Sequence, residues 1–533
     1  MDEKPLKLPI GIQSFDKLRC GNYLYVDKTG RLLELITSSP WCFLSRPRRF
    51  GKSLTLSTLD AMFSGKADLF KGLAAEEWVK EQAQHPSPVL RFDMSMVETG
   101  SVEAMKTTLK EMLGRAALFA GMEIRAQSLT GGFAELVMSL HQAKGPVVVL
   151  IDEYDKPMLD NIGNLELANE MRLTLRSFYT VLKSCDEYLR FVMLTGISKF
   201  SKVGVFSALN NLQDISMSRR YGDIAGYTQD ELERDFDEWI ADTAGALSTD
   251  KGKLLGRIRN YYDGFCFDGS TRLYNPFSIL NFFSEQEFRN YWYASGSPSF
   301  IVTYMRQHSI KDPETYCGVT VKEDFTSSQE IERANPVSFL YQAGYLTIKG
   351  REEQELILDY PNREVRDSIS SMYLEHVYNM EGYGALGSQI WRALKGRDIA
   401  KVVELYNVAL AGIPYEDYAD QGESWYRSLF LMLLRGAGIT ANGEAHTNRG
   451  RPDVIAQFPE QVAVLEFKYA KDGSEMESKR AEGERQIQEK NYARPYDGEN
   501  RAVMAAVIVI DGERHEASPY LYDGGEGGTG RMR

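Results

Sequence analysis

The stretch PVVVLIDEYD at 146–155 constrains the fold of this chain more than any other segment. Its apolar residues at 147–151 follow a Gly-Pro break and lead directly into Asp152 and Glu153. Short, continuous apolar runs rich in β-branched residues are typical of strands buried on both faces of a parallel sheet. We therefore predict a central strand that ends in two carboxylates, at the edge where open α/β sheets bind their ligands.

Other segments supply neighbours for this strand. Apolar runs at 41–45 (WCFLS), 89–95 (VLRFDMS) and 189–197 (LRFVMLTGI) predict further strands. Helical patterns separate these runs, including one that begins at Lys52 and ends near Phe63. Because strands that alternate with helices form βαβ units, we assign this part to the α/β class with a parallel sheet.

The composition limits the class of protein. A chain of 533 residues is too long for one ordinary core, so several domains are expected. No run of 18 apolar residues and no apolar leader appears, which predicts a cytoplasmic protein without a membrane partner. The cysteines are scattered and form no C-x-x-C pair, so neither disulfides nor zinc are expected. A net charge of −13 means that any contact with nucleic acid needs a local basic patch.

Residues 43–55, FLSRPRRFGKSLT, contain the second half of a phosphate-binding loop, G-x-x-x-x-G-K-[ST]. Arg46 stands where the first glycine of that pattern belongs. The segment follows a predicted strand and opens a predicted helix, so its backbone N–H groups can wrap phosphates at a helix N-terminus. Lys52 would reach the β- and γ-phosphates, and the Ser53 hydroxyl would bind Mg²⁺.

A Gly-Lys-Ser tripeptide alone is a weak signal, and the strand that ends in Asp152 and Glu153 makes it strong. Asp152 would hold Mg²⁺ through water, and Glu153 would orient or deprotonate the attacking water. Thr195, at the end of a later strand, either contacts the γ-phosphate or is an ordinary strand-end threonine. The predicted residues for binding ATP and Mg²⁺ are Arg49, Phe50, Gly51, Lys52, Ser53, Leu54, Asp152 and Thr195.

Several side chains near this loop have two interpretations. Arg46, Arg48 and Arg49 either flank the phosphates and stabilise charge or pair with acidic residues to hold the loop. Tyr25 and Asp27, in the turn-rich lead-in, either line the nucleotide pocket or pack that lead-in.

These motifs together resemble a known family. GNYLYVDKTGRL, FLSRPRRFGKSL, VVLIDEYDKP and LTGISKFSK are similar to the bacterial AAA-ATPase-like family of P-loop proteins. YNPFSILNFF, NYWYASGSP, LYQAGYLTI and YPNREVR extend the match over nearly the whole chain. R-P-R-R-F-G-K-S is the usual loop of that family, so Arg46 is no aberration. The resemblance implies ATP and Mg²⁺ at Gly51, Lys52, Ser53, Asp152 and Glu153.

A second group of charged residues lies near the C-terminus. Asp453 and the triplet at 466–468 form D-x₁₂-E-x-K, and alternate residues of a strand share one face, so Glu466 and Lys468 point the same way. Two carboxylates and a lysine suit Mg²⁺-dependent phosphodiester hydrolysis: the carboxylates hold the metal, and the lysine positions or deprotonates water. Glu423, on the preceding helix, can add a third carboxylate, with Glu444 as runner-up.

GRPD followed by LEFK, in the order helix, two paired strands, helix, strand, resembles the PD-(D/E)XK nuclease superfamily. The resemblance implies a restriction-endonuclease-like αββαβ domain with catalytic residues Asp453, Glu466 and Lys468. Gln486 and Lys490, on the following helix, stand where such nucleases often carry an auxiliary polar residue. The residues Asn448, Arg449 and Arg451 either contact a phosphate backbone or cap the turn.

We therefore expect a P-loop ATPase-like domain at 1–225, a helical lid with a winged-helix-like module at 226–375, a PD-(D/E)XK nuclease-like domain at 376–522, and a disordered Gly-rich tail at 523–533. The leading hypothesis is an ATPase coupled to a nuclease that acts on DNA or RNA. The alternative is a nucleotide-dependent switch or scaffold that binds nucleic acid or protein without cleavage; a kinase is weaker, because no acceptor-binding motif appears. A homo-oligomer is left open, with Arg219 and Arg220 as arginine-finger candidates by position.

Overall fold

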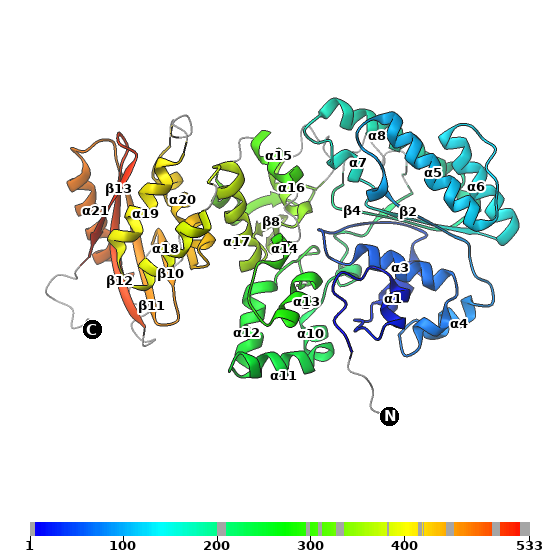
Figure 1. Ribbon diagram of the computed structural model, residues 1–533, viewed down its shortest axis with the longest axis horizontal. Coiled ribbons are helices and arrows are strands. Elements are labelled where there is room, and N and C mark those ends of the chain that lie inside the picture. The colour runs from blue at the N-terminus through cyan, green and yellow to red at the C-terminus, as the bar shows by residue number, and fades with distance from the viewer. Residues whose placement is uncertain are drawn as a thin grey trace. The chain divides into compact units, whose positions relative to one another are not determined.

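The computed structural model describes residues 6–199, 209, 211–294, 299–307, 312–326, 335–380, 383–413, 418, 421–443, 452–492 and 501–522 (Figure 1). Its contacts divide the chain into two compact units. The first unit comprises Met1–Tyr304 and Tyr316–Val365, and the second comprises Met305–Thr315 and Arg366–Arg533. The predicted boundary at 225 falls inside the first unit. Glu444, Asn448, Arg449, Arg451 and the predicted tail lie outside the described residues.

The first unit contains the predicted parallel sheet, with strand order β2-β3-β4-β1-β5 and every pairing parallel. The central strand β3 is buried at every position, as its apolar run predicts. The fifth strand was not predicted, because two residues are too short to show a period. The strands are β1 (Trp41–Ser45), β2 (Val89–Asp93), β3 (Val147–Asp152), β4 (Leu189–Gly196) and β5 (Gln213–Asp214).

Helices cover both faces of this sheet. In Figure 1, α1 (Phe15–Cys20), α3 (Lys52–Phe63) and α4 (Glu76–Gln82) lie on one side, and α5 (Val102–Ala120), α6 (Leu129–Lys144) and α8 (Leu165–Ser184) lie on the other. Leu56, Leu59 and Met62 of α3 belong to the same buried cluster as Val148 and Leu150 of β3. The α3 N-terminus is thereby fixed beside the carboxyl edge of the sheet. No helix in the described ranges is both long and apolar enough to span a bilayer.

The remainder of the first unit is mostly helical, as predicted. The helices include α10 (Gln229–Asp235), α11 (Asp237–Ala246), α12 (Lys251–Tyr262), α13 (Pro276–Glu285), α14 (Tyr291–Ala294) and α15 (Ser299–Gln307). The helix α16 (Pro336–Ala343) and an antiparallel sheet of order β6-β8-β7 lie in the part predicted to hold a winged-helix-like module, and that assignment stays a prediction. The strands of this sheet are β6 (Val319–Lys322), β7 (Thr347–Glu352) and β8 (Glu355–Asp359). The helix end, turn and strand predicted at 338–348 are confirmed.

The second unit is built on a mixed sheet of order β13-β12-β11-β10-β9. The predicted helix, two strands, helix and strand appear as α20 (Glu423–Gly436), β10 (Val454–Gln457), β11 (Gln461–Ala470), α21 (Met476–Lys490) and β12 (Ala502–Asp511). The antiparallel β10–β11 and parallel β11–β12 pairings form its centre. The edge strands β9 (Thr440–Gly443) and β13 (Glu516–Leu521) are additions, since TANG and EASPYL show no clear alternation.

Candidate functional site

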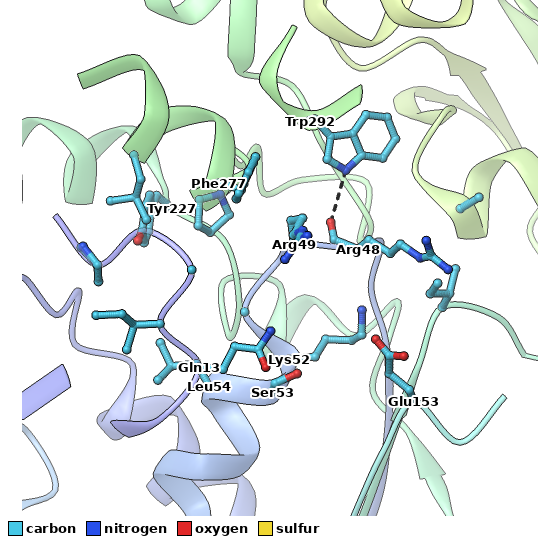
Figure 2. A pocket seen from close by; sticks show the side chains of 18 of the residues that line it. Gln13, Arg48, Arg49, Lys52, Ser53, Leu54, Glu153, Tyr227, Phe277 and Trp292 are labelled. Atoms are coloured by element: carbon cyan, nitrogen blue, oxygen red, sulfur yellow. Dashed lines mark hydrogen bonds between the residues drawn. The ribbon is translucent and has the colours of Figure 1, made fainter. Parts of the chain in front are cut away.

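A cavity of about 480 Å³ opens at the carboxyl edge of the first sheet (Figure 2). Cavities of this size are typical of small-molecule sites. The loop between β1 and α3 supplies much of the wall, and Glu153, directly after β3, faces it. Of the predicted nucleotide residues, the ones that line the cavity are Arg49, Gly51, Lys52, Ser53 and Leu54.

The backbone of this loop is held in unusual conformations. Gly51, the N-cap of α3, has a φ of 88°, and Arg49 has a φ of 67°. Glu153, directly after β3, also has a positive φ of 51°. For residues with a side chain this left-handed region is sparsely populated, and such strain gathers at functional sites. Arg49 lies in the phosphate-binding loop and Glu153 directly after the acidic strand end, so each of the two motifs contains one of these strained residues.

Lys52 is buried and donates hydrogen bonds to the carbonyl oxygens of Arg46, at 2.8 Å, and Pro47, at 2.9 Å. Burial lowers the pKa of its ammonium, while the carboxylates of Glu153 and Asp152 oppose that shift. The Lys52 ammonium thus binds the first residues of the phosphate-binding loop and is attracted by both carboxylates. Phosphate oxygens are stronger acceptors than carbonyls, so a bound triphosphate can replace these contacts.

The two carboxylates after β3 have different surroundings. Asp152 is buried, and its Oδ1 accepts hydrogen bonds from Thr195 Oγ1, at 2.6 Å, and from the Glu153 amide, at 3.1 Å. Thr195 is itself fully buried, so the structure places it against Asp152 rather than on the cavity wall. Burial raises the pKa of Glu153, with Lys52 acting in the opposite direction. A carboxylate with a raised pKa is a better proton acceptor, as the predicted role of Glu153 requires.

The loop's arginines separate into two groups. Arg46 is buried, donates to the carbonyl oxygens of Ser45 and Ser216, and lies 4.4 Å from the ring of Phe267. It does not line the cavity, so of its two interpretations the structure favours bracing of the loop. Arg48 and Arg49 do line the cavity. Phe50, a predicted nucleotide residue, packs its side chain against Phe265 and Phe267 and is buried.

The opposite wall of the cavity was not predicted. It is formed by the lead-in around 9–13 and by residues far along the chain, including Tyr227, Phe277, Trp292 and Tyr345. The aromatic-rich segments were visible in the sequence, but only the fold brings them to the loop.

The lead-in residues Tyr25 and Asp27 have structural contacts instead. Tyr25 packs on Phe15, and Asp27 accepts hydrogen bonds from the amides of Thr29 and Ala74. Neither lines the cavity, so the structure favours the packing interpretation for both.

The turn after α16 touches the phosphate-binding loop directly. Gly344 has a φ of 90°, and a Cβ atom on it would lie 2.5 Å from Cγ of Pro47. Ala343 and Tyr345, on either side, line the cavity. The turn between α16 and β7 therefore forms part of the cavity wall.

Replacing Gly344 with alanine should destabilise the first unit by about 2 kcal/mol or more, because a left-handed backbone and overpacking each cost about 1–2 kcal/mol. Since the turn lines the cavity, affinity for a fluorescent ATP analogue should fall as well. Chemical denaturation and analogue titration measure the two effects. Gly350→Ala, in β7, is the matched control, because its Cβ would meet only Ile357 at an ordinary 3.7 Å. Equal stability of the two variants would contradict the tight contact.

The predicted residues of the second unit converge on one spot. Asp453, just before β10, accepts a hydrogen bond from the Phe467 amide through Oδ2, at 2.8 Å. Lys468 donates to Oε1 of Glu466, at 2.8 Å, and to the carbonyl oxygen of Phe467. All three charged side chains are largely buried. The antiparallel register of β10 and β11 brings them together, as the D-x₁₂-E-x-K spacing predicts.

Glu466 has an unsatisfied buried oxygen. Its Oε2 atom has no hydrogen-bond partner, and burial, reinforced by the charge of Asp453, raises the pKa of Glu466 to about 7. A buried carboxylate oxygen without a partner, beside a second carboxylate, fits a divalent cation. Mg²⁺ in particular is often held by one or two carboxylates together with water and phosphate oxygens. Among the described residues, no three His, Cys, Asp or Glu side chains form a metal-binding group, so Asp453 and Glu466 are the pair that fits.

Two residues of α20 border this pair. Burial raises the pKa of Glu423, and the charges of Lys468 and Asp453 are close enough to affect it as well. A role of Glu423 as a ligand of the cation stays a prediction. Arg427, one helical turn later, donates to Oδ1 of Asp453 at 3.0 Å. Arg427 was not predicted, although its spacing from Glu423 places both residues on one helix face. On α21, Gln486 donates to the Tyr492 hydroxyl.

The fold and these sites define a P-loop α/β protein with a nuclease-like second domain, and comparisons with known proteins agree. The family described as predicted AAA-ATPase matches residues 9–206, and the PD-(D/E)XK nuclease superfamily matches 421–518. An uncharacterized protein in the vnfD 5′ region of Azotobacter chroococcum is 36% identical over 473 residues, covering 87% of this chain and 89% of that protein. The chain belongs to the AAA-ATPase-like family and carries a C-terminal PD-(D/E)XK nuclease superfamily domain.

Solved structures show weaker likenesses. The Aeropyrum pernix ORC1 protein in complex with DNA is 10% identical, with a TM-score of 0.25 over 64% of this chain and 91% of that one. CDC6P from Pyrobaculum aerophilum is 13% identical, with a TM-score of 0.21 over 83% and 89%. Overlaps this low carry no information about partners.

Proposed function

We propose that the first unit binds and hydrolyses ATP. The observation that carries this proposal is the convergence of Lys52, Ser53 and Glu153 on one cavity, with Asp152 directly behind it. Mg²⁺ bound near Ser53 and Asp152 would neutralise charge that develops on the phosphates. The backbone amides at the start of α3 would donate hydrogen bonds to the phosphate oxygens, and the Lys52 ammonium would pair with the same oxygens.

Glu153 would orient the attacking water and accept its proton. Its raised pKa and its position opposite Lys52 suit that role. The aromatic wall, with Tyr227 and Phe277, would exclude water from the nucleotide base and sugar. The test is release of inorganic phosphate from ATP by the purified chain, with and without Mg²⁺. The proposal requires Mg²⁺-dependent release, and it fails if the chain does not turn over ATP.

We further propose that the second unit cleaves phosphodiester bonds in DNA or RNA. The orphaned Oε2 atom of Glu466 beside Asp453 supports this activity. A divalent cation held by these two carboxylates would act as a Lewis acid on the scissile phosphate. Lys468, fixed between Glu466 and the Phe467 carbonyl, would position the attacking water or take its proton.

Incubation of the full chain with single- and double-stranded DNA and RNA, with Mg²⁺ or Mn²⁺, tests this second activity. The proposal requires metal-dependent cleavage of at least one of these substrates. Failure to cut any of them in the presence of either metal would favour the scaffold function.

One observation favours that alternative, a switch or scaffold without cleavage. Oδ1 of Asp453 accepts from Arg427, Oδ2 accepts from the Phe467 amide, and Lys468 pairs with Glu466. Arginine and lysine thus balance both carboxylates. A site balanced in this way can persist as a structural ion-pair network.

Replacing Arg427 with glutamine separates these functions. If a cation competes with Arg427 for Asp453, the variant should bind Mn²⁺ about tenfold more tightly, as expected for about 1.4 kcal/mol of lost competition. Calorimetric titration of the full chain with Mn²⁺ measures the change. Arg435→Gln is no suitable control, because the Arg435 side chain is buried and pairs with Glu314. Arg480 of α21 is partly exposed and pairs with the partly exposed Glu484, so Arg480→Gln is the better control. Unchanged Mn²⁺ affinity in Arg427→Gln would contradict the competition.

A further inference from the structure

The cavity wall carries several cationic side chains, and their contacts distinguish them. Arg49 lies over the ring of Phe277 at 5.1 Å, and Lys156 pairs with Asp160. Lys52 bridges its own loop. Arg48 instead lies in the same part of the cavity as Lys52 and Glu153, and its charge acts on both of them (Figure 2). Arg48 thus lies in the part of the cavity where Lys52 and Glu153 are expected to act on the γ-phosphate and on the attacking water.

The backbone of Arg48 is held by residues of α14 and of the α13 N-terminus. Its carbonyl oxygen accepts from Trp292 Nε1 at 3.3 Å, drawn in Figure 2, and from Asn275 Nδ2 at 3.5 Å. The buried carboxylate of Glu364 links α13 and α14, because it accepts hydrogen bonds from the Trp292 amide and the Ser278 hydroxyl. These contacts hold in place the backbone from which the Arg48 side chain extends, and charges that are fixed in position stabilise a transition state without reorganisation.

We propose that Arg48 is a catalytic residue of the ATP site, whose guanidinium contacts the γ-phosphate and stabilises the charge that develops during its transfer. This inference rests on the proposed ATPase function. Water forms a bond to the γ-phosphorus as its proton passes to Glu153. The bond to the β–γ bridging oxygen breaks, and its electron pair leaves with ADP. Arg48 supplies in the same chain the charge that an arginine finger supplies from a neighbour.

The arginine-finger candidates named from the sequence have other surroundings. Arg220 is more than half exposed, with its nearest carboxylate Glu34 at 3.8 Å, and its guanidinium lies over Tyr221. Neither Arg219 nor Arg220 lines the cavity. The inference therefore predicts that ATP hydrolysis needs no second copy of the chain.

The experiment compares Arg48→Gln, Arg48→Lys and the matched surface variant Arg220→Gln in the full chain. We expect Arg48→Gln to lower kcat by about 10²-fold or more while ATP affinity, from titration of a fluorescent analogue, changes by less than about threefold. Arg48→Lys should recover part of kcat because it keeps a positive charge, and Arg220→Gln should match the wild type. Turnover per chain should stay constant over a wide dilution series. Trapping of ADP with aluminium fluoride, which imitates the transferred phosphoryl group, should be lost in Arg48→Gln.

The contrary outcomes are equally specific. A kcat within threefold of wild type in Arg48→Gln would overturn the catalytic role. Turnover that falls on dilution, together with loss of activity in Arg220→Gln, would transfer that role to a neighbouring chain and overturn the inference in another way. If Arg48→Gln loses ATP affinity while kcat at saturating ATP is unchanged, Arg48 serves uniform binding and the catalytic role is overturned. Wild-type protein that binds ATP without hydrolysing it would overturn both this inference and the proposed ATPase function.

Discussion

Replacing Lys52 with alanine should lower kcat for ATP hydrolysis by about 10²–10³-fold. Lys52 is buried at the base of the cavity, and its removal takes away the ammonium that would pair with the β- and γ-phosphates. One preorganised charge or donor of this kind is worth about 3–4 kcal/mol, and each 1.36 kcal/mol corresponds to a tenfold change in rate. Phosphate release under saturating ATP and Mg²⁺ measures the effect.

Glu153→Gln should separate binding from turnover at the same site. The amide keeps the shape of the side chain but cannot accept the proton of water, so kcat should fall while ATP affinity is preserved. Lys106→Ala is the matched control, since Lys106 is an exposed residue of α5 that pairs with Glu103 and does not line the cavity. Normal turnover in both Lys52→Ala and Glu153→Gln would disprove the assignment of the ATP site.

Replacing Asp453 or Lys468 with alanine should abolish metal-dependent cleavage of nucleic acid by the full chain. Asp453 and Glu466 are the carboxylates that would hold the cation, and Lys468, which pairs with Glu466, would act as the base or position the water. Loss of either should slow cleavage by about 10³-fold, since metal-assisted charge stabilisation contributes several kcal/mol. Gel analysis of the substrate that the wild type cuts best measures this loss.

Because Lys468→Ala leaves buried Glu466 without its partner, thermal unfolding must show that the second unit remains folded. Lys471→Ala, three residues beyond Lys468 and exposed, is the matched control and should retain cleavage. Cleavage that survives in folded Asp453→Ala would place the active site elsewhere.

Much of the fold followed from local patterns. The run ending in Asp152 specified a strand buried on both faces, and the helix from Lys52 to Phe63 was predicted at its observed bounds. Patterns fail where elements are short: β5 has two residues, and β9 contains Asn and Gly, which give no hydrophobic period. Such strands form because neighbouring strands offer free backbone groups, a tertiary effect that a local window does not contain.

The candidate site was predictable on one side only. Lys52, Ser53 and Glu153 belong to motifs with fixed spacing, so their convergence could be expected. Phe277 and Trp292 reach the cavity because α13 and α14 pack over the loop, and nothing in their own spacing encodes that contact. The role of Arg46 was likewise undecidable from sequence, since a basic residue in a phosphate loop can point either way. Its hydrogen bonds to Ser45 and Ser216 show that it points away from the cavity.

Arg427 illustrates a different limit. Its partner Asp453 is distant in sequence, and an arginine on an amphipathic helix is usually solvated. Only the packing of α20 against β10 and β11 reveals that it pairs with a predicted metal ligand. Sequence motifs therefore identified the acidic residues but not the cation that balances them.

The central claim is that this chain binds divalent cations with its own residues at both sites, one with ATP and one in the C-terminal sheet. A crystal of the full chain grown with Mn²⁺ and a non-hydrolysable ATP analogue tests it directly, because Mn²⁺ is located by its anomalous scattering. We predict one peak beside Ser53 and Asp152, next to the analogue's phosphates, and a second between Asp453 and Glu466. Absence of either peak at a saturating Mn²⁺ concentration would contradict the claim.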